Sequence, residues 1–257
     1  MSGDDSSLWI RRYQPWDEAP FRVVCFPYAG GSASYYFPVA KALASTADVL
    51  AIQYPGRQDR RSEKCLGTIG ELADEVTEVL RPWLDRPTVL FGHSMGATLG
   101  FEVARRLEAG GGPLLALFAS GRVAPSRARD ETVHLADDAG LIKAVKELGG
   151  AGAEVFGNEE LLRMILPALR TDYRAAETYR YEPGPLLDTP IHVHLGDNDP
   201  KVTVGEARDW RNHTTGSCTL TTYPGGHFYL NAHAPKVIQA IVDVLTTAGR
   251  ATSAQPL

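Results

Sequence analysis

The chain has 257 residues, of which 44% are hydrophobic, and a formal net charge of −5 at pH 7. This length suits one large α/β domain, with or without an inserted cap, and the acidic balance argues against nucleic-acid binding. No segment approaches the roughly 18 apolar residues of a membrane span, and the polar start lacks the pattern of a signal peptide. Three scattered cysteines argue against a disulfide framework, so we expect a cytoplasmic protein.

Apolar strands alternate with helical patterns along most of the chain. Buried strands are predicted at residues 22–26, 49–53, 88–91, 114–119, 191–195 and 219–223, and helices at residues 36–44, 69–80, 97–108 and 237–245. Because strands that are buried on both faces read as continuous apolar runs, this order predicts a mostly parallel central sheet flanked by helices. Ligands of such sheets bind beyond the carboxyl ends of the strands.

A serine stands at a sharp turn after the strand at residues 88–91. The sequence Gly92-His93-Ser94-Met95-Gly96 matches the G-x-S-x-G nucleophile elbow, a strained bend that exposes the serine hydroxyl between a strand and a helix. The glycines allow that strand and helix to approach closely. We therefore predict that Ser94 is the nucleophile of a hydrolase; the alternative is a glycine-rich loop whose serine only caps the helix.

A serine nucleophile also needs N–H donors that stabilise the oxyanion of its tetrahedral intermediate. Met95, which follows the serine, supplies one donor through its backbone. The turn after the first strand, Tyr28-Ala29-Gly30, supplies the second, for which we choose Ala29; an ordinary tight turn is the alternative. We expect Tyr28, on the same turn, to border the substrate.

Residues 125–187 interrupt the alternation, because they contain helical patterns and no clear strand. The segment is far longer than a usual crossover, which favours an inserted helical lid over ordinary crossover helices. A proline at residue 167 should kink or divide its second helix. One face of that helix is apolar and is predicted to bind substrate through Leu162, Ile165, Leu166 and Leu169.

The elbow fold places an acid and then a histidine after the serine in chain order. His227 lies in the glycine-rich loop after the last strand and is the predicted general base. The orienting acid should follow the strand at residues 191–195, where Asp197 and Asp199 are both candidates. We prefer Asp199, because it lies deeper in the turn and precedes a proline that fixes the backbone.

These features together predict an α/β-hydrolase fold with an inserted helical lid. The core would comprise residues 1–124 and 188–245, and the lid residues 125–187. Residues 246–257 are small and polar, and we expect them to form a disordered tail.

Five segments, in this order along the chain, carry a more specific likeness. They are the opening turn at residues 25–32, the turn Gln53-Tyr54-Pro55-Gly56-Arg57, the elbow helix at residues 92–105, the lid segment at residues 166–173 and the histidine loop at residues 225–228. They resemble the motifs of type II thioesterases, the editing enzymes of polyketide and nonribosomal peptide assembly lines. The resemblance covers nearly the whole chain.

The resemblance implies hydrolysis of acyl thioesters on the phosphopantetheine arm of acyl or peptidyl carrier proteins, which removes stalled or aberrant acyl groups. It implies neither a metal nor an organic cofactor. We expect a monomer with no membrane or nucleic-acid partner. Basic residues at Arg57, Arg60 and Arg61 follow a strand and could dock an acidic carrier protein, or could tie down local backbone.

Other functions stay open at this point. A small-molecule carboxylesterase or lipase-like ester hydrolase would share the triad, although the HGGG-type oxyanion loop of such enzymes is absent. A non-catalytic carrier-binding protein would have no need of Ser94, Asp199 and His227. A starting methionine and short tails favour a free-standing protein over a domain of a synthase.

Overall fold

The computed structural model of the chain describes residues 8–149 and 159–253. Within these residues, seven strands form one sheet in the order β1-β3-β2-β4-β5-β6-β7. Neighbouring strands are parallel except β1 and β3, which run antiparallel. The predicted mostly parallel sheet is confirmed. Its strands are β1 (Ile10–Arg11), β2 (Arg22–Phe26), β3 (Asp48–Ile52), β4 (Thr88–His93), β5 (Leu114–Ser120), β6 (Ile191–Gly196) and β7 (Cys218–Tyr223).

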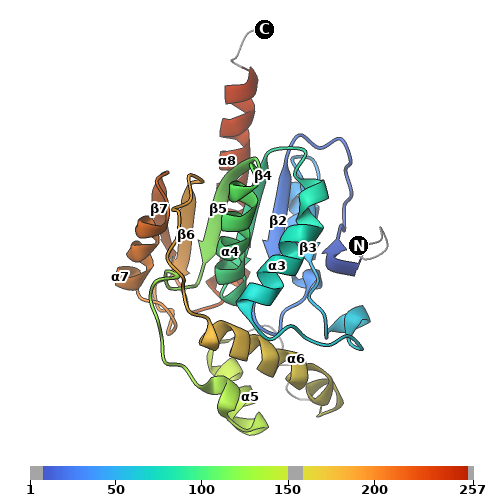
Figure 1. Cartoon of the computed structure of the whole chain (residues 1–257), viewed down its shortest axis with the longest axis vertical. Helices are drawn as coiled ribbons and strands as arrows, with labels where there is room; N and C mark the ends of the chain where they lie inside the picture. Colours follow the sequence, from blue (N-terminus) through green and yellow to red (C-terminus); the bar gives the residue numbers. More distant parts are fainter. Residues whose placement is uncertain (1–7, 150–158, 254–257) are drawn as a thin grey trace.

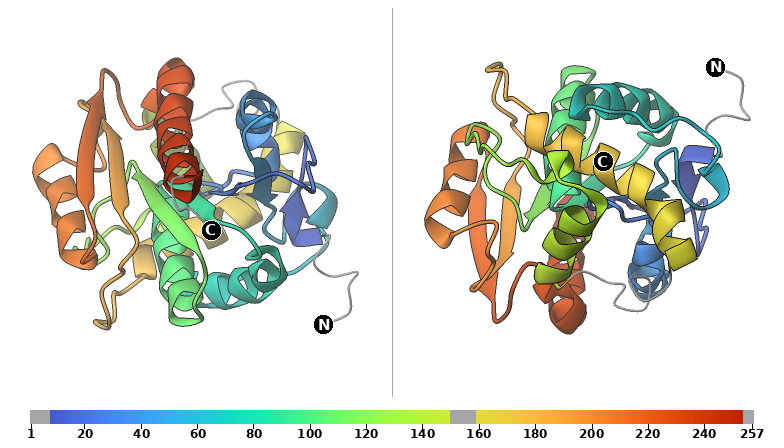
Figure 2. Two further views of the ribbon diagram at one scale, coloured as in Figure 1. Left: turned by 90° about the horizontal axis from the view of Figure 1, so that it is seen from above. Right: turned by 90° about the horizontal axis from the view of Figure 1, so that it is seen from below.

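Helices cover both faces of this sheet (Figures 1 and 2). On one face lie α3 (Ile69–Leu80) and α4 (Met95–Ala109), and on the other lie α2 (Phe37–Leu43) and α8 (Tyr229–Ser253). A hydrophobic core fills each of the two interfaces. Because both faces are covered, β2, β3 and β4 are buried along their whole length. The short helix α7 (Val204–Ala207) lies beside the β6–β7 edge.

Two further helices, α5 (Asp138–Glu147) and α6 (Glu159–Thr178), lie across the carboxyl ends of the strands (Figures 1 and 2). We call them the cap helices. Arg170 of α6 links them, because its guanidinium donates to the carbonyls of His134 and Ala136 and to the Asp138 carboxylate. The cap helices therefore cover the edge of the sheet where a ligand is expected.

Two expectations about helix ends need correction. Helix α6 is not divided at Pro167, since it is one element on both sides of the proline. After the proline, Leu169 and Tyr173 are buried and pack with Leu141 of α5. Helix α8 continues past residue 245 to Ser253, so residues 246–253 are not a disordered tail. There Thr247 donates to the Asp243 carbonyl, and Gly249 lies against the Phe21 ring. Residues 254–257 lie outside the described part of the chain.

The closest approach between the layers lies where α4 leaves the end of β4. A Cβ atom placed on Gly96 would stand 2.1 Å from the carbonyl oxygen of Phe26 in β2. A Cβ atom on Gly92 would stand 2.0 Å from the carbonyl oxygen of Gly96. Both contacts are with backbone, which cannot rotate away as a side chain can. The spacing between strand and helix therefore requires glycine at both positions.

We expect Gly96→Ala to lower the free energy of unfolding by about 2 kcal/mol, because overpacking outweighs the higher helix propensity of alanine. Urea unfolding followed by circular dichroism measures the effect. Gly70→Ala in α3 is the matched control, since its nearest neighbour would lie 3.9 Å from the new Cβ atom, and it should be neutral or slightly stabilising. Equal stability of Gly96→Ala and the wild type would contradict the packing argument.

Candidate active site

Ser94 lies between β4 and α4 in a conformation that side-chain-bearing residues rarely adopt. Its φ is 55° and its ψ is −119°, in the positive-φ region that favours glycine. The Ser94 N–H donates to the carbonyl of Ser120 in β5 at 2.8 Å, which holds the strained turn in place. Strain of this kind persists where the surrounding structure enforces it, and it concentrates at functional sites. Here it brings the Ser94 side chain to the wall of a cavity.

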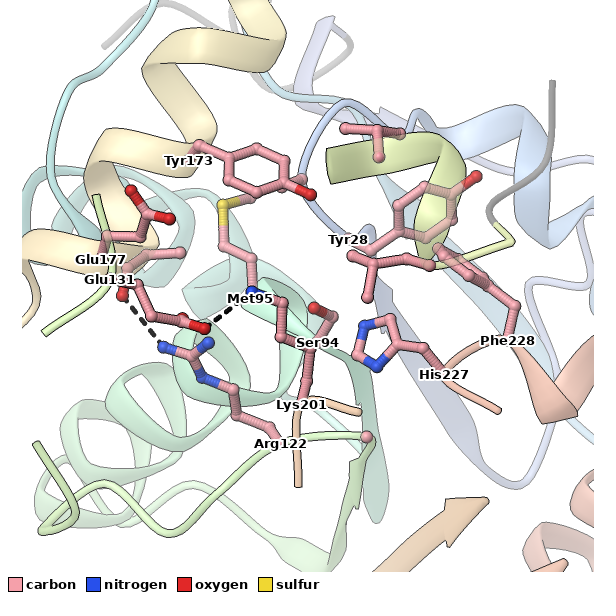
Figure 3. Close-up of a pocket in the computed structure, with 15 residues that line it drawn as sticks. Tyr28, Ser94, Met95, Arg122, Glu131, Tyr173, Glu177, Lys201, His227 and Phe228 are labelled. Carbon is pink, nitrogen blue, oxygen red and sulfur yellow. Dashed lines mark hydrogen bonds and ion pairs between the residues drawn. The ribbon is translucent and has the colours of Figure 1, made fainter. Parts of the chain in front are cut away.

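His227 and Asp199 form a buried pair beside this serine. The Nδ1 atom of His227 lies 2.9 Å and 3.0 Å from the two carboxylate oxygens of Asp199. Asp199 also accepts the N–H of Lys201 at 2.8 Å, which fixes the carboxylate. The imidazole lies next to Ser94 in the cavity (Figure 3). Asp197 is directed elsewhere, because it accepts the N–H of Gly225 at 3.0 Å. The structure thus brings together Ser94, His227 and Asp199.

The predicted oxyanion donors border the same cavity. Ala29 and Met95 both line it, and they come from the ends of different elements. Met95 is the first residue of α4, where N–H groups have no acceptor within the helix. Among the hydrogen bonds of residues 8–149 and 159–253, none uses the N–H of Ala29. Tyr28, which we expected to border the substrate, also lines the cavity. Its ring packs edge-on against Phe228, with 4.9 Å between the ring centroids.

A second histidine lies beside the predicted base. The ring of His93 is buried, with its centroid 4.8 Å from that of His227. Its Nδ1 atom lies 2.9 Å from the Ser120 hydroxyl, which in turn lies 2.6 Å from the Tyr229 hydroxyl. Burial, and to a lesser degree the neighbouring His227, lowers the pKa of His93 well below its usual value. A neutral His93 can pack against His227 without opposing its protonation.

The cavity measures about 60 Å³ and has one apolar and one charged wall. The apolar wall includes Val145 and Leu148 at the end of α5, and Tyr173 and Ala176 of α6. The charged wall consists of Arg122, Glu131, Glu177 and Lys201. Figure 3 shows Arg122, Glu131 and Glu177 on the side opposite His227.

Ion pairs and hydrogen bonds hold the charged wall together. Lys201 pairs with Glu131 at 2.7 Å, and Arg122 donates to the carbonyl of Ala176 at 2.9 Å. Arg122, Glu131 and Lys201 come from loops without a motif, and Glu177 lies near the end of α6; no signal in the sequence identified them.

The predicted substrate-binding residues of the lid are not among those that line this cavity. Leu162 lines a separate, open hollow between α5 and α6. Leu166 and Leu169 pack in a small cluster with Tyr173. Ile165 is half-buried and also lies apart from the cavity. Counted from Leu169, helix α6 reaches the cavity one to two turns further on, through Tyr173, Ala176 and Glu177.

Two of the arginines expected to dock a partner are not available for that role. Arg57 is 9% exposed and Arg60 is 3% exposed. Arg57 pairs with Asp172 of α6, and Arg60 pairs with Glu63 at 2.6 Å. Only Arg61 of the three is exposed. Of the two alternatives, docking is wrong for Arg57 and Arg60, because both side chains are buried and bind partners within the chain.

Comparisons with known proteins agree on one family. A family model described as a thioesterase domain matches residues 21–245. The chain is 51% identical to a probable cadicidin biosynthesis thioesterase of Streptomyces griseus, over 94% of this chain and 67% of that protein. It is 45% identical to thioesterase PikA5 of Streptomyces venezuelae, over 95% of this chain and 88% of that protein. None of the described helices is long and apolar enough to cross a membrane.

Solved structures give the same result. The type II thioesterase BorB from the borrelidin biosynthetic cluster is 54% identical, with a TM-score of 0.88 over 93% of this chain and 98% of that chain. RedJ, a thioesterase of the prodiginine pathway of Streptomyces coelicolor, is 36% identical, with a TM-score of 0.82 over 88% of this chain and 86% of that chain. The predicted α/β-hydrolase fold and the resemblance to type II thioesterases are confirmed.

The geometry predicts which serine reacts with a fluorophosphonate probe. We expect the adduct on Ser94, located by peptide mass spectrometry, and none on the buried Ser120. Asp199→Asn should slow labelling by roughly 10³-fold, because His227 loses the carboxylate that fixes its tautomer. Asp197→Asn is the matched control and should label at nearly the wild-type rate. If the Asp197 variant were the slower of the two, the choice of carboxylate would be wrong.

Proposed function

The chain belongs to the thioesterase family, and we propose that it hydrolyses acyl thioesters on the phosphopantetheine arm of acyl or peptidyl carrier proteins. The reaction would remove stalled or aberrant acyl groups from a polyketide or nonribosomal peptide assembly line. The observation that supports it most is that Ser94 and His227 line one cavity and Asp199 binds His227, in a chain 54% identical to a type II thioesterase. Its relatives do not favour the alternative of a general carboxylesterase.

In the proposed reaction, the Ser94 hydroxyl attacks the thioester carbonyl. His227 takes the hydroxyl proton on Nε2, while its Nδ1–H stays bonded to Asp199 at 2.9 Å. Both partners of that bond are buried, so the carboxylate stabilises the imidazolium in a region from which water is excluded. The backbone N–H groups of Ala29 and Met95 would stabilise the oxyanion.

Collapse of the tetrahedral intermediate breaks the carbon–sulfur bond. The imidazolium of His227 gives its proton to the departing pantetheine thiolate, which leaves as the thiol, and the acyl group stays on Ser94 as an ester. A water molecule then enters, gives a proton to His227 and attacks the ester. The second collapse returns the proton to Ser94 and releases the carboxylic acid. No group outside the triad and the two donors is needed to balance these steps.

The cap helices would act as a lid over the acyl group, as the division into core and lid implied. The small volume of the cavity, about 60 Å³, favours short acyl chains. The cysteines among residues 8–149 and 159–253 are all free, which fits a protein of the reducing cytoplasm. We propose that the enzyme acts there as a monomer.

Intact-mass spectrometry of carrier proteins tests the proposed function. Incubation with acetyl and propionyl carrier proteins should remove the acyl mass and leave the free thiol, and Ser94→Ala should abolish this change while eluting as a folded monomer in gel filtration. The same acyl groups on nitrophenyl esters serve as the comparison. Carriers that stay acylated while the esters are cleaved would support the carboxylesterase alternative instead.

A larger residue on the cavity side of α6 should change the preference for acyl length. Ala176→Leu adds volume to the cavity wall, and we expect the ratio of kcat/KM for hexanoyl over acetyl carrier to fall at least about tenfold. Leu162→Trp, about four turns away in the open hollow, is the matched control and should leave this ratio unchanged. The opposite pattern would mean that the acyl chain follows the face chosen from the sequence.

A further inference from the structure

The loop that carries Ala29 connects β2 to α2, and residues from other elements hold its backbone. The carbonyl of Pro27 accepts from the Tyr54 hydroxyl at 3.0 Å. The N–H of Ala33 donates to the Gln53 side chain at 2.8 Å. These contacts fix the two ends of the loop against β3 and the turn that follows it. The centre of the loop, where the proposed oxyanion donor lies, is held differently.

At the centre, the N–H of Gly30 donates to Asp172 of the cap helix α6 at 2.7 Å. The same carboxylate pairs with Arg57 through both oxygens, at 2.6 Å and 2.9 Å. Arg57 in turn donates to the carbonyl of Gly31 at 3.1 Å. Asp172 is 1% exposed, so a carboxylate and a guanidinium form a buried, bidentate pair that contacts the loop from both sides.

Two consecutive peptide planes around Ala29 are fixed by this arrangement. Gly30 N–H belongs to the Ala29–Gly30 peptide, whose plane is set by the bond to Asp172. The Tyr28–Ala29 peptide contains the Ala29 N–H, and its carbonyl accepts from Gly31 N–H at 2.8 Å. The carbonyl of Gly31 accepts a hydrogen bond from Arg57. The direction of the Ala29 N–H therefore depends on bonds that end at the Arg57–Asp172 pair.

A second contact from α6 supports the same loop. Gly30 has a φ of +76°, and a Cβ atom there would stand 2.6 Å from Cδ1 of Leu169. Leu169 and Asp172 are three residues apart on α6, so they lie on one face of the helix. One side chain packs on the loop and the other binds its backbone. The cap helix thus contacts the oxyanion loop at the residue next to Ala29.

We propose that Asp172, held in place by Arg57, is a positioning residue for thioester hydrolysis: it fixes the Gly30 amide and so directs the neighbouring Ala29 N–H toward the oxyanion. This inference rests on the proposed function. Arg57 neutralises the Asp172 charge, so the carboxylate can orient the loop without opposing the negative charge that develops in the transition state. The pair also makes the oxyanion donor depend on the position of the cap helix.

Two variants separate this role from general stability. Asp172→Ala removes the acceptor but leaves the buried Arg57 charge without its carboxylate, which destabilises the fold. Arg57→Met/Asp172→Leu removes both charges together, and apolar replacements of that kind are often tolerated in buried pairs. The matched control is Asp48→Ala. Asp48 is 0% exposed, pairs with Arg12 at 3.0 Å, and lies at the amino end of β3, at the edge of the sheet opposite the site.

The first readout is kinetic. For the double variant we expect kcat on acetyl carrier to fall roughly 10- to 100-fold with KM changed less than about threefold, because the lost interaction operates in the transition state. Asp172→Ala, where folded, should show the same loss. Asp48→Ala should lose stability in thermal unfolding but keep kcat near that of the wild type.

The second readout reports the oxyanion directly. A ¹³C-labelled trifluoromethyl ketone forms a hemiketal with the serine, and its carbon shift follows the ionisation of the oxyanion. In the double variant the hemiketal pKa should rise by at least about one unit, which corresponds to a tenfold loss of oxyanion stabilisation. In Asp48→Ala it should match the wild type.

The outcomes are distinguishable. A folded double variant with wild-type kcat and an unchanged hemiketal pKa would overturn the positioning role and leave the thioesterase function standing. A wild-type enzyme that does not deacylate carriers would overturn both. A fall in kcat together with a raised hemiketal pKa, absent from the Asp48 control, would support the proposal.

Discussion

The close contact between the first turn of α4 and the end of β2 determines the rest of the site. A side chain on Gly96 would meet the Phe26 carbonyl at 2.1 Å, so helix and strand can be this close only through glycine. The contact forces the chain to reverse within one residue, and Ser94 takes up the strain with a φ of 55°. It also brings the free N–H groups at the start of α4 next to the loop that leaves β2. The proposed nucleophile and the proposed oxyanion donors therefore meet because two elements nearly touch.

Charge inside the site is balanced by pairing or by neutrality. His93 lies 4.8 Å from His227, and its lowered pKa keeps it uncharged beside a base that must become protonated. Asp199 is the carboxylate in contact with that base, and the other nearby acids have partners of their own. Asp172 is paired with Arg57, and Glu131 with Lys201. In a low-dielectric site an unpaired charge is costly, so these pairs stabilise the fold around the proposed proton transfer.

The cap helices cover the site, line part of the cavity and bind the loop that follows β2. Their apolar side chains form part of the cavity wall, and Asp172 reaches through to the backbone of the opposite loop. Binding of a carrier protein near the cap would then act on the same helix that contacts the oxyanion loop. Within the charged wall, Arg122, Glu131 and Glu177 lie on the side of the cavity opposite His227 (Figure 3), whereas the backbone N–H of Lys201 binds Asp199 at 2.8 Å.

The sequence alone determined the order of elements and the local chemistry. Hydrophobic periodicity and turn residues predicted all the parallel strands, and they selected as candidates the elbow serine, the acid in its Asp-Pro turn and the glycine-flanked histidine, because each of these signals is local. It did not find β1, which has only the residues Ile10–Arg11, or the continuation of α8 to Ser253, because packing against other elements decided both.

Tertiary structure alone decided which lid residues face the cavity. The sequence indicated the apolar face of α6 but not how far along the helix the cavity lies, so it selected Leu162 rather than Tyr173 and Ala176. It also left open whether Arg57 docks a carrier protein or ties down local backbone, because the partner that buries it, Asp172, is 115 residues away along the chain. A local sequence pattern indicates the backbone conformation that a segment prefers, but contacts between distant segments form only when the whole chain packs.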